Sequence, residues 1–231
     1  MDQTSQNNFL VPIAIVIAGA FIAGAIYFGG AKQSNPSTSS GQATNTEIDI
    51  SPITERDHVL GSRDAEIMIV EYSDTECPFC KSFHSIMKEI LRTYGNDVAW
   101  VYRHFPIKNL HSRAPKEAEA TECAYELGGN QAFWNYIDKL FETTNSNDSL
   151  DPSELPKIAV AVGLDAVAFN NCLSSGKYTE FVNKSIEEAV KSGARGTPYS
   201  IIISKGGEEK AVINGAEPIE MVKAKIDALL D

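Results

Sequence analysis

Four cysteines are the residues of this 231-residue sequence whose type and spacing could do chemistry: Cys77, Cys80, Cys123 and Cys172. The first two form a C-P-F-C motif, and such a pair can form and break a disulfide. Four cysteines could instead bind zinc, but structural zinc sites usually draw on two close pairs. Here the second pair is widely separated in the sequence. The spacing therefore favours redox chemistry, and we predict neither a metal nor another cofactor.

The C-P-F-C motif lies where a buried strand is expected to turn into a helix. Ile67–Val70 is a short apolar run typical of a buried strand, and residues 78–94 carry apolar side chains at helical spacing. This places Cys77 at the helix N-terminus, where unpaired backbone N–H groups and the helix dipole favour a thiolate. Pro78 suits the first helical turn. Cys80 falls one turn further in, less exposed and close enough to resolve a mixed disulfide.

The periodicity of the remaining sequence predicts the elements that must position this motif. These are strands at Val98–Tyr102, Tyr199–Ser204 and Lys210–Asn214, several helices within 112–193, and a final amphipathic helix at Glu217–Leu230. Gly128-Gly129 is expected to end one of the helices in the block. The helical block shows no pattern for a second sheet, so we expect one α/β domain with a single sheet and an inserted helical subdomain.

A separate segment precedes this domain. Phe9–Phe28 is an uncharged apolar run, long enough to span a bilayer as a helix. We predict one N-terminal transmembrane helix, with residues 1–30 as a membrane anchor; a cleaved signal peptide and a buried core helix are the alternatives. Residues 31–50 are small and polar, which predicts a flexible linker. Residues 51–231 form the predicted catalytic domain, with its helical insertion at about 108–193.

The sequence is acidic, with a net charge of -11 at pH 7. An acidic surface disfavours nucleic acid and anionic membrane surfaces as partners. Lys32, which follows the apolar segment, weakly favours an N-terminus outside the cytoplasm. Disulfide chemistry in the domain favours the opposite orientation. We therefore predict a single-pass protein of the cell membrane whose catalytic domain is extracytoplasmic, on the periplasmic or outer face.

Five separated segments resemble the DsbA-type thioredoxin-like oxidoreductases. They are EYSDTECPFCKSFH, VYRHFPIKNLH, ATECAYELGGNQAFWNYIDKLF, FNNCLSSGKY and GARGTPYSIII. The segments follow one another in the family's order, and the resemblance covers about residues 52–231. It implies a thioredoxin-like fold with an inserted helical subdomain. The apolar segment and the second cysteine pair resemble the membrane-anchored members of the family.

The resemblance also implies roles for individual residues. Cys77 matches the attacking cysteine and Cys80 the resolving one. Thr197-Pro198 matches the cis-proline turn that packs against the active-site disulfide, with Thr197 as the main substrate contact; a trans proline before a strand is the alternative. Glu71 matches a buried acid that can move a proton to or from Cys80, its pKa raised by desolvation. The alternative is that Glu71 reaches water at the end of its strand.

The sequence departs from the family pattern at Phe79. The best-known strongly oxidising members carry a histidine there, whereas phenylalanine neither donates a hydrogen bond nor carries a charge. Asp74 and Glu76 add negative charge close by. We therefore expect a higher pKa for Cys77 and a less oxidising disulfide than in the histidine-bearing relatives. Phe79 itself is a candidate substrate contact.

The second cysteine pair and the histidines are expected to be structural. Cys123 and Cys172 each lie on the apolar face of a predicted helix, and their pairing is the one that leaves the active site intact. We predict a structural disulfide between them, with two free buried thiols as the alternative. The four histidines show no metal-ligand spacing, and we interpret His104 and His111 as structural.

These features together predict a protein thiol–disulfide oxidoreductase. It would introduce disulfides into exported proteins with free thiols, and a membrane protein of the DsbB-like or VKOR-like kind would re-oxidise it. The alternatives are an extracytoplasmic disulfide reductase or isomerase, a Cu(I)-binding carrier, an inert Cys77–Cys80 disulfide, and a tethered binding module without activity.

Overall fold

The computed structural model describes residues 48–230 of the chain. The predicted membrane helix at Phe9–Phe28 and most of the predicted linker lie outside the described residues. Between residues 48 and 230, no helix combines the length and the apolar character needed to cross a membrane.

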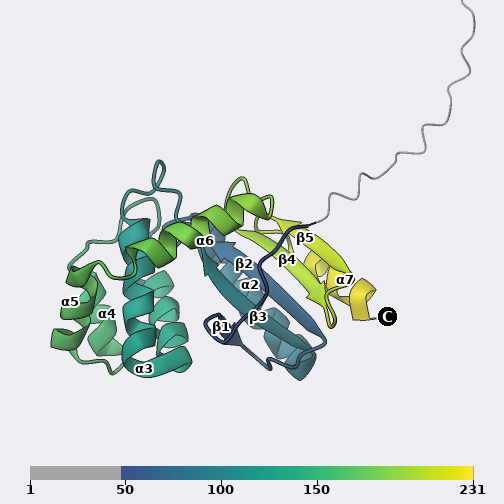
Figure 1. The fold of residues 1–231 in the computed structure, drawn as a ribbon, viewed down its shortest axis with the longest axis horizontal. Helices are drawn as coiled ribbons and strands as arrows, with labels where there is room; N and C mark the ends of the chain where they lie inside the picture. The colour runs from purple at the N-terminus through teal and green to yellow at the C-terminus, as the bar shows by residue number, and fades with distance from the viewer. Residues whose placement is uncertain (1–47, 231) are drawn as a thin grey trace, which may run out of the picture. The chain divides into compact units, whose positions relative to one another are not determined.

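One five-stranded sheet is the centre of the described domain (Figure 1). Its strands are β1 (His58–Leu60), β2 (Ile67–Ser73), β3 (Val98–His104), β4 (Tyr199–Ser204) and β5 (Lys210–Asn214). Their order in the sheet is β1-β3-β2-β4-β5. β2 and β3 run parallel, and every other neighbouring pair is antiparallel. The first and last parts of the domain therefore share one sheet, as the sequence predicts, with β2 at its centre.

Three helices pack on the two faces of this sheet: α2 (Pro78–Tyr94), α6 (Thr179–Lys191) and α7 (Ile219–Leu230). Side chains of a strand alternate between its faces. Ile67 of β2 points into a core that contains Phe83 of α2 and Val222 of α7. Val70 points the other way, into a second core with Ala189 of α6. The sheet is therefore the middle layer, with α2 and α7 on one face and α6 on the other (Figure 1).

The helix α2 begins and ends where the sequence predicts. Cys77 is its N-cap residue, and Pro78 occupies the start of its first turn. At the other end Gly95 has a φ of 58°, a left-handed value that glycine adopts without steric cost, and its N–H bonds to Leu91 O. The short 3-10 helix η1 (Gly95–Asp97) then leads into β3.

The inserted helices lie beside the sheet (Figure 1) and contain a core of their own. They are α3 (Ala114–Thr143), α4 (Glu154–Ala161) and α5 (Ala166–Ser175). The predicted break at Gly128-Gly129 is a kink within α3, because Gly129 has a non-helical φ of 72° and the helix resumes after it. Tyr136 and Phe169 stack in this core, with ring centroids 5.4 Å apart.

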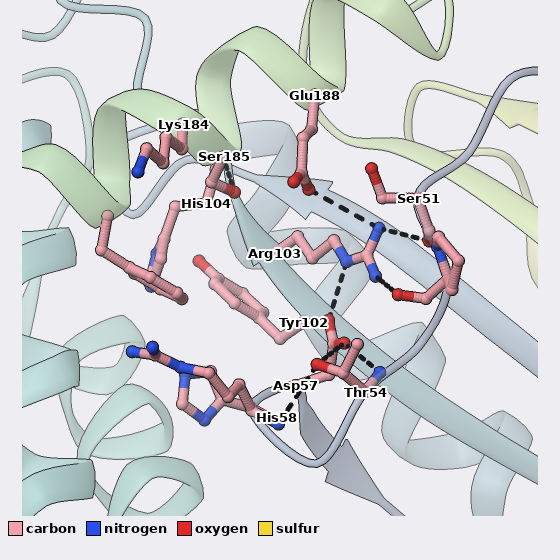
Figure 2. A pocket seen from close by; sticks show the side chains of 13 residues that line it. Ser51, Thr54, Asp57, His58, Tyr102, Arg103, His104, Lys184, Ser185 and Glu188 are labelled. Carbon is pink, nitrogen blue, oxygen red and sulfur yellow. Dashed lines mark hydrogen bonds and ion pairs between the residues drawn. The ribbon is translucent and has the colours of Figure 1, made fainter.

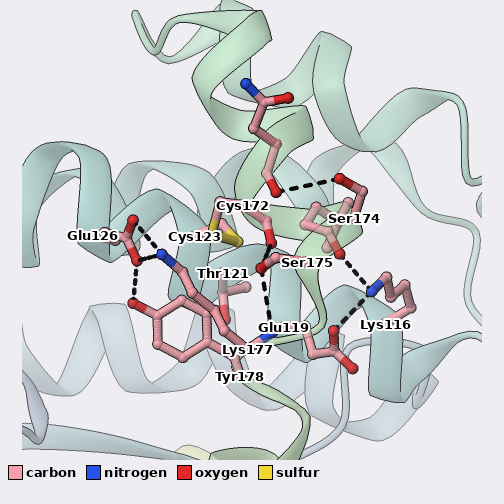
Figure 3. The surroundings of a disulfide bond; sticks show 12 residues. Lys116, Glu119, Thr121, Cys123, Glu126, Cys172, Ser174, Ser175, Lys177 and Tyr178 are labelled. Carbon is pink, nitrogen blue, oxygen red and sulfur yellow. Dashed lines mark hydrogen bonds and ion pairs between the residues drawn. A yellow bond between two sulfur atoms is a disulfide. The ribbon is translucent and has the colours of Figure 1, made fainter.

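A disulfide between Cys123 and Cys172 joins α3 to α5, with the two Cα atoms 5.8 Å apart (Figure 3). Both residues belong to the core of the inserted helices. Polar contacts surround the bridge: Lys177 and Tyr178 both bond to Glu126, each at 2.6 Å. The disulfide therefore cross-links two of the inserted helices.

Replacing both Cys123 and Cys172 by alanine should lower the free energy of unfolding by about 2–4 kcal/mol, because the bridge closes a long loop in the unfolded chain. Urea unfolding of the double variant and the wild type measures the difference. The rate at which Cys77 and Cys80 exchange with glutathione should stay the same, because they lie in a different core. An unchanged unfolding midpoint would show that the bridge does not stabilise the domain.

Candidate active site

Cys77 and Cys80 lie at the junction of the central strand and α2. β2 ends at Ser73, and the loop that follows brings Cys77 to the first position of the helix. Both cysteines are free. Cys77 is 6% exposed, whereas Cys80, one turn further into the helix, is fully buried. Cys77 is therefore the sulfur that another molecule can reach.

The sulfur atoms of the two cysteines contact the backbone on either side of them. The Cys77 thiol donates to the carbonyl oxygen of Thr197 at 3.4 Å. The backbone N–H of Asp74 donates to Cys80 Sγ, also at 3.4 Å. The Thr197-Pro198 peptide bond is cis and comes directly before β4. The structure thus brings together Cys77, Cys80, Thr197 and Pro198, which are far apart in the sequence.

The two thiols have opposite electrostatic surroundings. A hydrogen bond from the Cys80 thiol lowers the pKa of Cys77 to about 6, against the effect of burial, with help from backbone N–H groups and from Thr197. Burial raises the pKa of Cys80, and the nearby Cys77 and Glu71 raise it further. At neutral pH Cys77 therefore carries the thiolate while Cys80 holds its proton, which is the asymmetry that nucleophilic attack by one thiol and resolution by the other require.

The two acids of the active-site loop are fully buried and hydrogen-bonded. The Asp74 carboxylate accepts bonds from Glu76 N at 2.9 Å, Ile107 N at 2.7 Å and His111 Nδ1 at 2.9 Å. The Glu76 carboxylate accepts from three donors after α3: Thr144 Oγ1, Ser149 N and Leu150 N. Both acids are thus held in place by donors, and the pKa of Cys77 is lowered by its own hydrogen bonds to Cys80, to backbone N–H groups and to Thr197. The comparison with the histidine-bearing relatives stays a prediction.

Glu71 lies within the sheet beneath the dithiol and is 1% exposed. It sits opposite Tyr102 on β3 and Ser200 on β4. Neither carboxylate oxygen has a hydrogen-bond partner in the described part of the chain. Burial raises the pKa of Glu71 to about 8, and the charge of Cys77 adds to the rise. Glu71 is therefore a buried acid that keeps its proton at neutral pH.

An exposed aromatic side chain lies beside the dithiol. Phe79, between the two cysteines, is 64% exposed, and Thr197 is half-buried next to Cys77. A large exposed aromatic side chain beside a reactive sulfur offers contact area to a bound polypeptide. Among the predicted site residues, only Cys123 and Cys172 lie away from this region, in the core of the inserted helices.

His111, interpreted as structural from the sequence, has a contact beside the dithiol that the sequence did not predict. It precedes α3 and pairs with Asp74, the residue whose backbone contacts Cys80. Its presence in the segment VYRHFPIKNLH was the available signal, but a pairing across 37 positions is a tertiary contact that spacing does not reveal.

Two other histidines lie at the end of a cavity of about 320 Å³ between the segment before β1, the end of β3, and α6 (Figure 2). His58 Nε2 and His104 Nε2 contact the same oxygen of Glu122, at 2.6 and 2.7 Å. Burial alone would raise the pKa of Glu122, but the two imidazoles lower it to about 2. The ligand atoms of the three side chains lie within 4.8 Å of one another, a spacing at which they could also hold a metal ion. The two contacts to Glu122 tie β1, β3 and α3 together.

Comparison with known proteins gives the family. A family model described as Thioredoxin matches residues 53–228. DsbA2 of Pseudomonas aeruginosa has 27% sequence identity and a TM-score of 0.67, and the match covers 77% of this chain and 97% of that structure. BdbD of Bacillus subtilis, in its oxidised form, has 22% identity and a TM-score of 0.68, with 79% and 97% covered. The second match, at its low identity, shows the fold alone.

Among curated relatives, the Na(+)/H(+) antiporter NhaA 1 of Mycolicibacterium gilvum is 35% identical over 153 residues. The match covers 65% of this chain but 24% of that protein. The chain thus spans about a quarter of the length of the curated relatives that it matches, and the antiporter name belongs to those whole proteins. The family match spans nearly all described residues, and the structural matches agree with it. The chain belongs to the thioredoxin family, and it has the fold of the DsbA-type thiol–disulfide oxidoreductases.

Proposed function

We propose that the chain oxidises the thiols of exported proteins by donating a Cys77–Cys80 disulfide. One observation carries the proposal: an accessible cysteine with a lowered pKa sits at a helix N-terminus, hydrogen-bonded to a buried cysteine with a raised pKa. Stabilising the thiolate of the reduced form makes the corresponding disulfide more oxidising.

The reaction requires two exchange steps. A substrate thiolate attacks Cys77 Sγ of the disulfide, forms a mixed disulfide and expels the sulfur of Cys80, which takes up a proton. A second thiolate of the substrate then attacks the substrate sulfur of the mixed disulfide and releases Cys77 as a thiolate. The substrate loses two electrons and gains a disulfide, and the Cys77–Cys80 pair gains both electrons. The lowered pKa of Cys77 makes it a good leaving group in the second step.

Glu71 is suited to supply the proton that Cys80 takes up. It is protonated at neutral pH because its pKa is about 8, and its charge influences the titration of Cys80. Since Cys80 is fully buried, solvent does not reach it directly. An acid at this position, with a pKa near the working pH, can donate the proton and recover it when the disulfide re-forms.

Substrate would bind over Phe79 and Thr197. Phe79 offers an exposed apolar face beside the reacting sulfur, and Thr197 already contacts Cys77 through its carbonyl oxygen. Pro198, which follows Thr197 through a cis peptide bond, is buried. These features suit an extended polypeptide that presents its cysteine to Cys77.

We place the catalytic domain outside the cytoplasm, held to the membrane by Phe9–Phe28. The Cys123–Cys172 disulfide supports this location, because stable disulfides persist in oxidising compartments. Each turnover leaves Cys77 and Cys80 reduced, so the protein needs an electron acceptor. A membrane protein of the DsbB-like or VKOR-like kind would re-oxidise the pair.

Cys80→Ser should trap mixed disulfides with substrate proteins, because it leaves Cys77 reactive and removes the thiol that resolves it. Cys77→Ser should trap few. Non-reducing gels of cells that express each variant measure the trapping. Equal trapping by the two variants would reject the assignment of nucleophile and resolving thiol.

Glu71→Gln should change the pH dependence of stability. The pKa of Glu71 is about 8 in the folded protein and 4.5 as the reference value, so the wild type loses stability as the pH rises between these values. The loss is about 1.4 kcal/mol per pH unit in this window, and glutamine, which does not titrate, escapes it. Urea unfolding from pH 5 to pH 9 should therefore show the variant gaining on the wild type with rising pH. Parallel profiles would mean that Glu71 is not buried in its protonated form.

The reduction potential of the Cys77–Cys80 pair decides the direction of electron flow. It should lie between roughly −120 mV, the value for DsbA, and roughly −270 mV, the value for thioredoxin, and Phe79→His should raise it. Equilibration with glutathione measures both. A wild-type value at or below that of thioredoxin would favour a disulfide reductase instead. An unchanged potential in Phe79→His would show that the residues between the cysteines do not set it.

A further inference from the structure

Asp74 connects the dithiol to the loop between β3 and α3. Its backbone N–H donates to Cys80 Sγ at 3.4 Å, and its carbonyl oxygen accepts the N–H of Cys77 at 3.1 Å. Its carboxylate, 1% exposed, accepts Ile107 N at 2.7 Å and His111 Nδ1 at 2.9 Å. The same residue therefore holds both cysteines through its backbone and an imidazole through its side chain.

The loop that carries His111 is fixed at both ends. At its start, Phe105 N donates to Ser73 O at 2.7 Å. At its end, the carboxylate of Asp148 accepts the backbone N–H groups of Ser112 and Arg113, at 2.7 and 3.0 Å. His111 itself is 7% exposed, and its N–H bonds to the carbonyl oxygen of Ile107. The imidazole is thus held in place before any substrate arrives.

A buried carboxylate this close to the dithiol has an electrostatic consequence. Left alone, the negative charge of Asp74 would disfavour a thiolate on Cys77. Phe79 supplies no compensating charge from between the cysteines. The titratable groups that act on His111 are Asp74, Cys77 and Asp148, and all three favour its charged form. Burial opposes that form, but the net effect is a raised pKa for His111.

We propose that His111 is a positioning residue of the dithiol site: its imidazolium neutralises Asp74 and so preserves the thiolate of Cys77. This inference rests on the proposed function only in that both use the Cys77–Cys80 pair. Phe79 carries no charge, so in this site the cation comes from the loop between β3 and α3 and acts through the Asp74 carboxylate. His111 touches neither substrate nor sulfur in this role.

The test compares His111→Gln with the double variant Asp74→Asn/His111→Gln in the full chain. The single change leaves Asp74 charged and unpaired, so the pKa of Cys77, followed by thiolate absorbance, should rise by about one unit. The equilibrium constant with glutathione should shift about tenfold toward the disulfide, which is about 30 mV for a two-electron couple. The double variant removes both charges and should return both quantities toward the wild type. His58→Gln, which alters a different histidine–carboxylate contact, should change neither.

Three results would overturn the proposal. The first is that His111→Gln leaves the pKa of Cys77 and the reduction potential unchanged. The second is that the double variant is no closer to the wild type than the single variant. A purely structural role of His111 would give this second result, because the Asp74→Asn change would then add to the damage. The third needs no variant. NMR titration of His111 in the wild type should give a higher pKa when the pair is reduced than when it is oxidised, because only the reduced form carries the Cys77 thiolate, and equal values would contradict the coupling. A low reduction potential of the wild type would reject thiol oxidation as the function. The comparison of the His111 variants with the wild type would still test the role of His111.

Discussion

The hydrogen bonding that stabilises the Cys77 thiolate at the N-terminus of α2 is the interaction on which the rest of the site depends. Its hydrogen bonds to the Cys80 thiol and to backbone N–H groups lower the pKa of Cys77 to about 6. Those donors stay in place because α2 is packed into the main core through Phe83, Met87 and Ile90, all fully buried. The chemistry of one sulfur is therefore set by the burial of a whole helix.

The same region buries four carboxyl groups, and the structure stabilises them in three different ways. Glu71 and Glu117 keep their protons, because burial raises the pKa of each to about 8. The Glu76 carboxylate accepts hydrogen bonds from three donors in the segment after α3. Asp74 is paired with a histidine. A buried charge without a partner is costly, so protonation, hydrogen bonding and ion pairing are the three solutions available, and all three occur within a few residues of the dithiol.

The sequence predicts features set by neighbouring residues, and it does not predict contacts between residues far apart in the chain. Periodicity places α2, β4 and β5 at their observed bounds, because α2 and β4 each have several buried residues and turn residues flank β5. It misses β1, since three residues are too few to show a period. Glu71 and Thr197-Pro198 become candidates only through resemblance to the DsbA-type family. The pairing of His111 with Asp74 and the cluster around Glu122 are invisible in the sequence, because each joins elements that only the folded sheet brings together.

The inserted helices are part of the active site's support. The loop before Cys77 bonds to the segment after α3, where Asn147 N donates to Glu76 O at 2.7 Å. It also bonds to α3 itself, since Thr75 donates to Glu117 at 2.6 Å. Ser146, Asn147 and Asp148 all have left-handed φ values, between 57° and 66°. Such values are uncommon outside glycine and persist where surrounding contacts enforce them.

The contacts that enforce this left-handed turn are those that hold the site. Asn147 bonds to Glu76, and Asp148 accepts the backbone N–H groups of Ser112 and Arg113 beside His111. One turn after α3 therefore fixes both the acidic loop that carries Cys77 and the loop that carries the imidazole. Loosening that turn would disturb the two loops together. The geometry around the Cys77 thiolate thus also depends on the segment that follows α3, in addition to the sheet and α2.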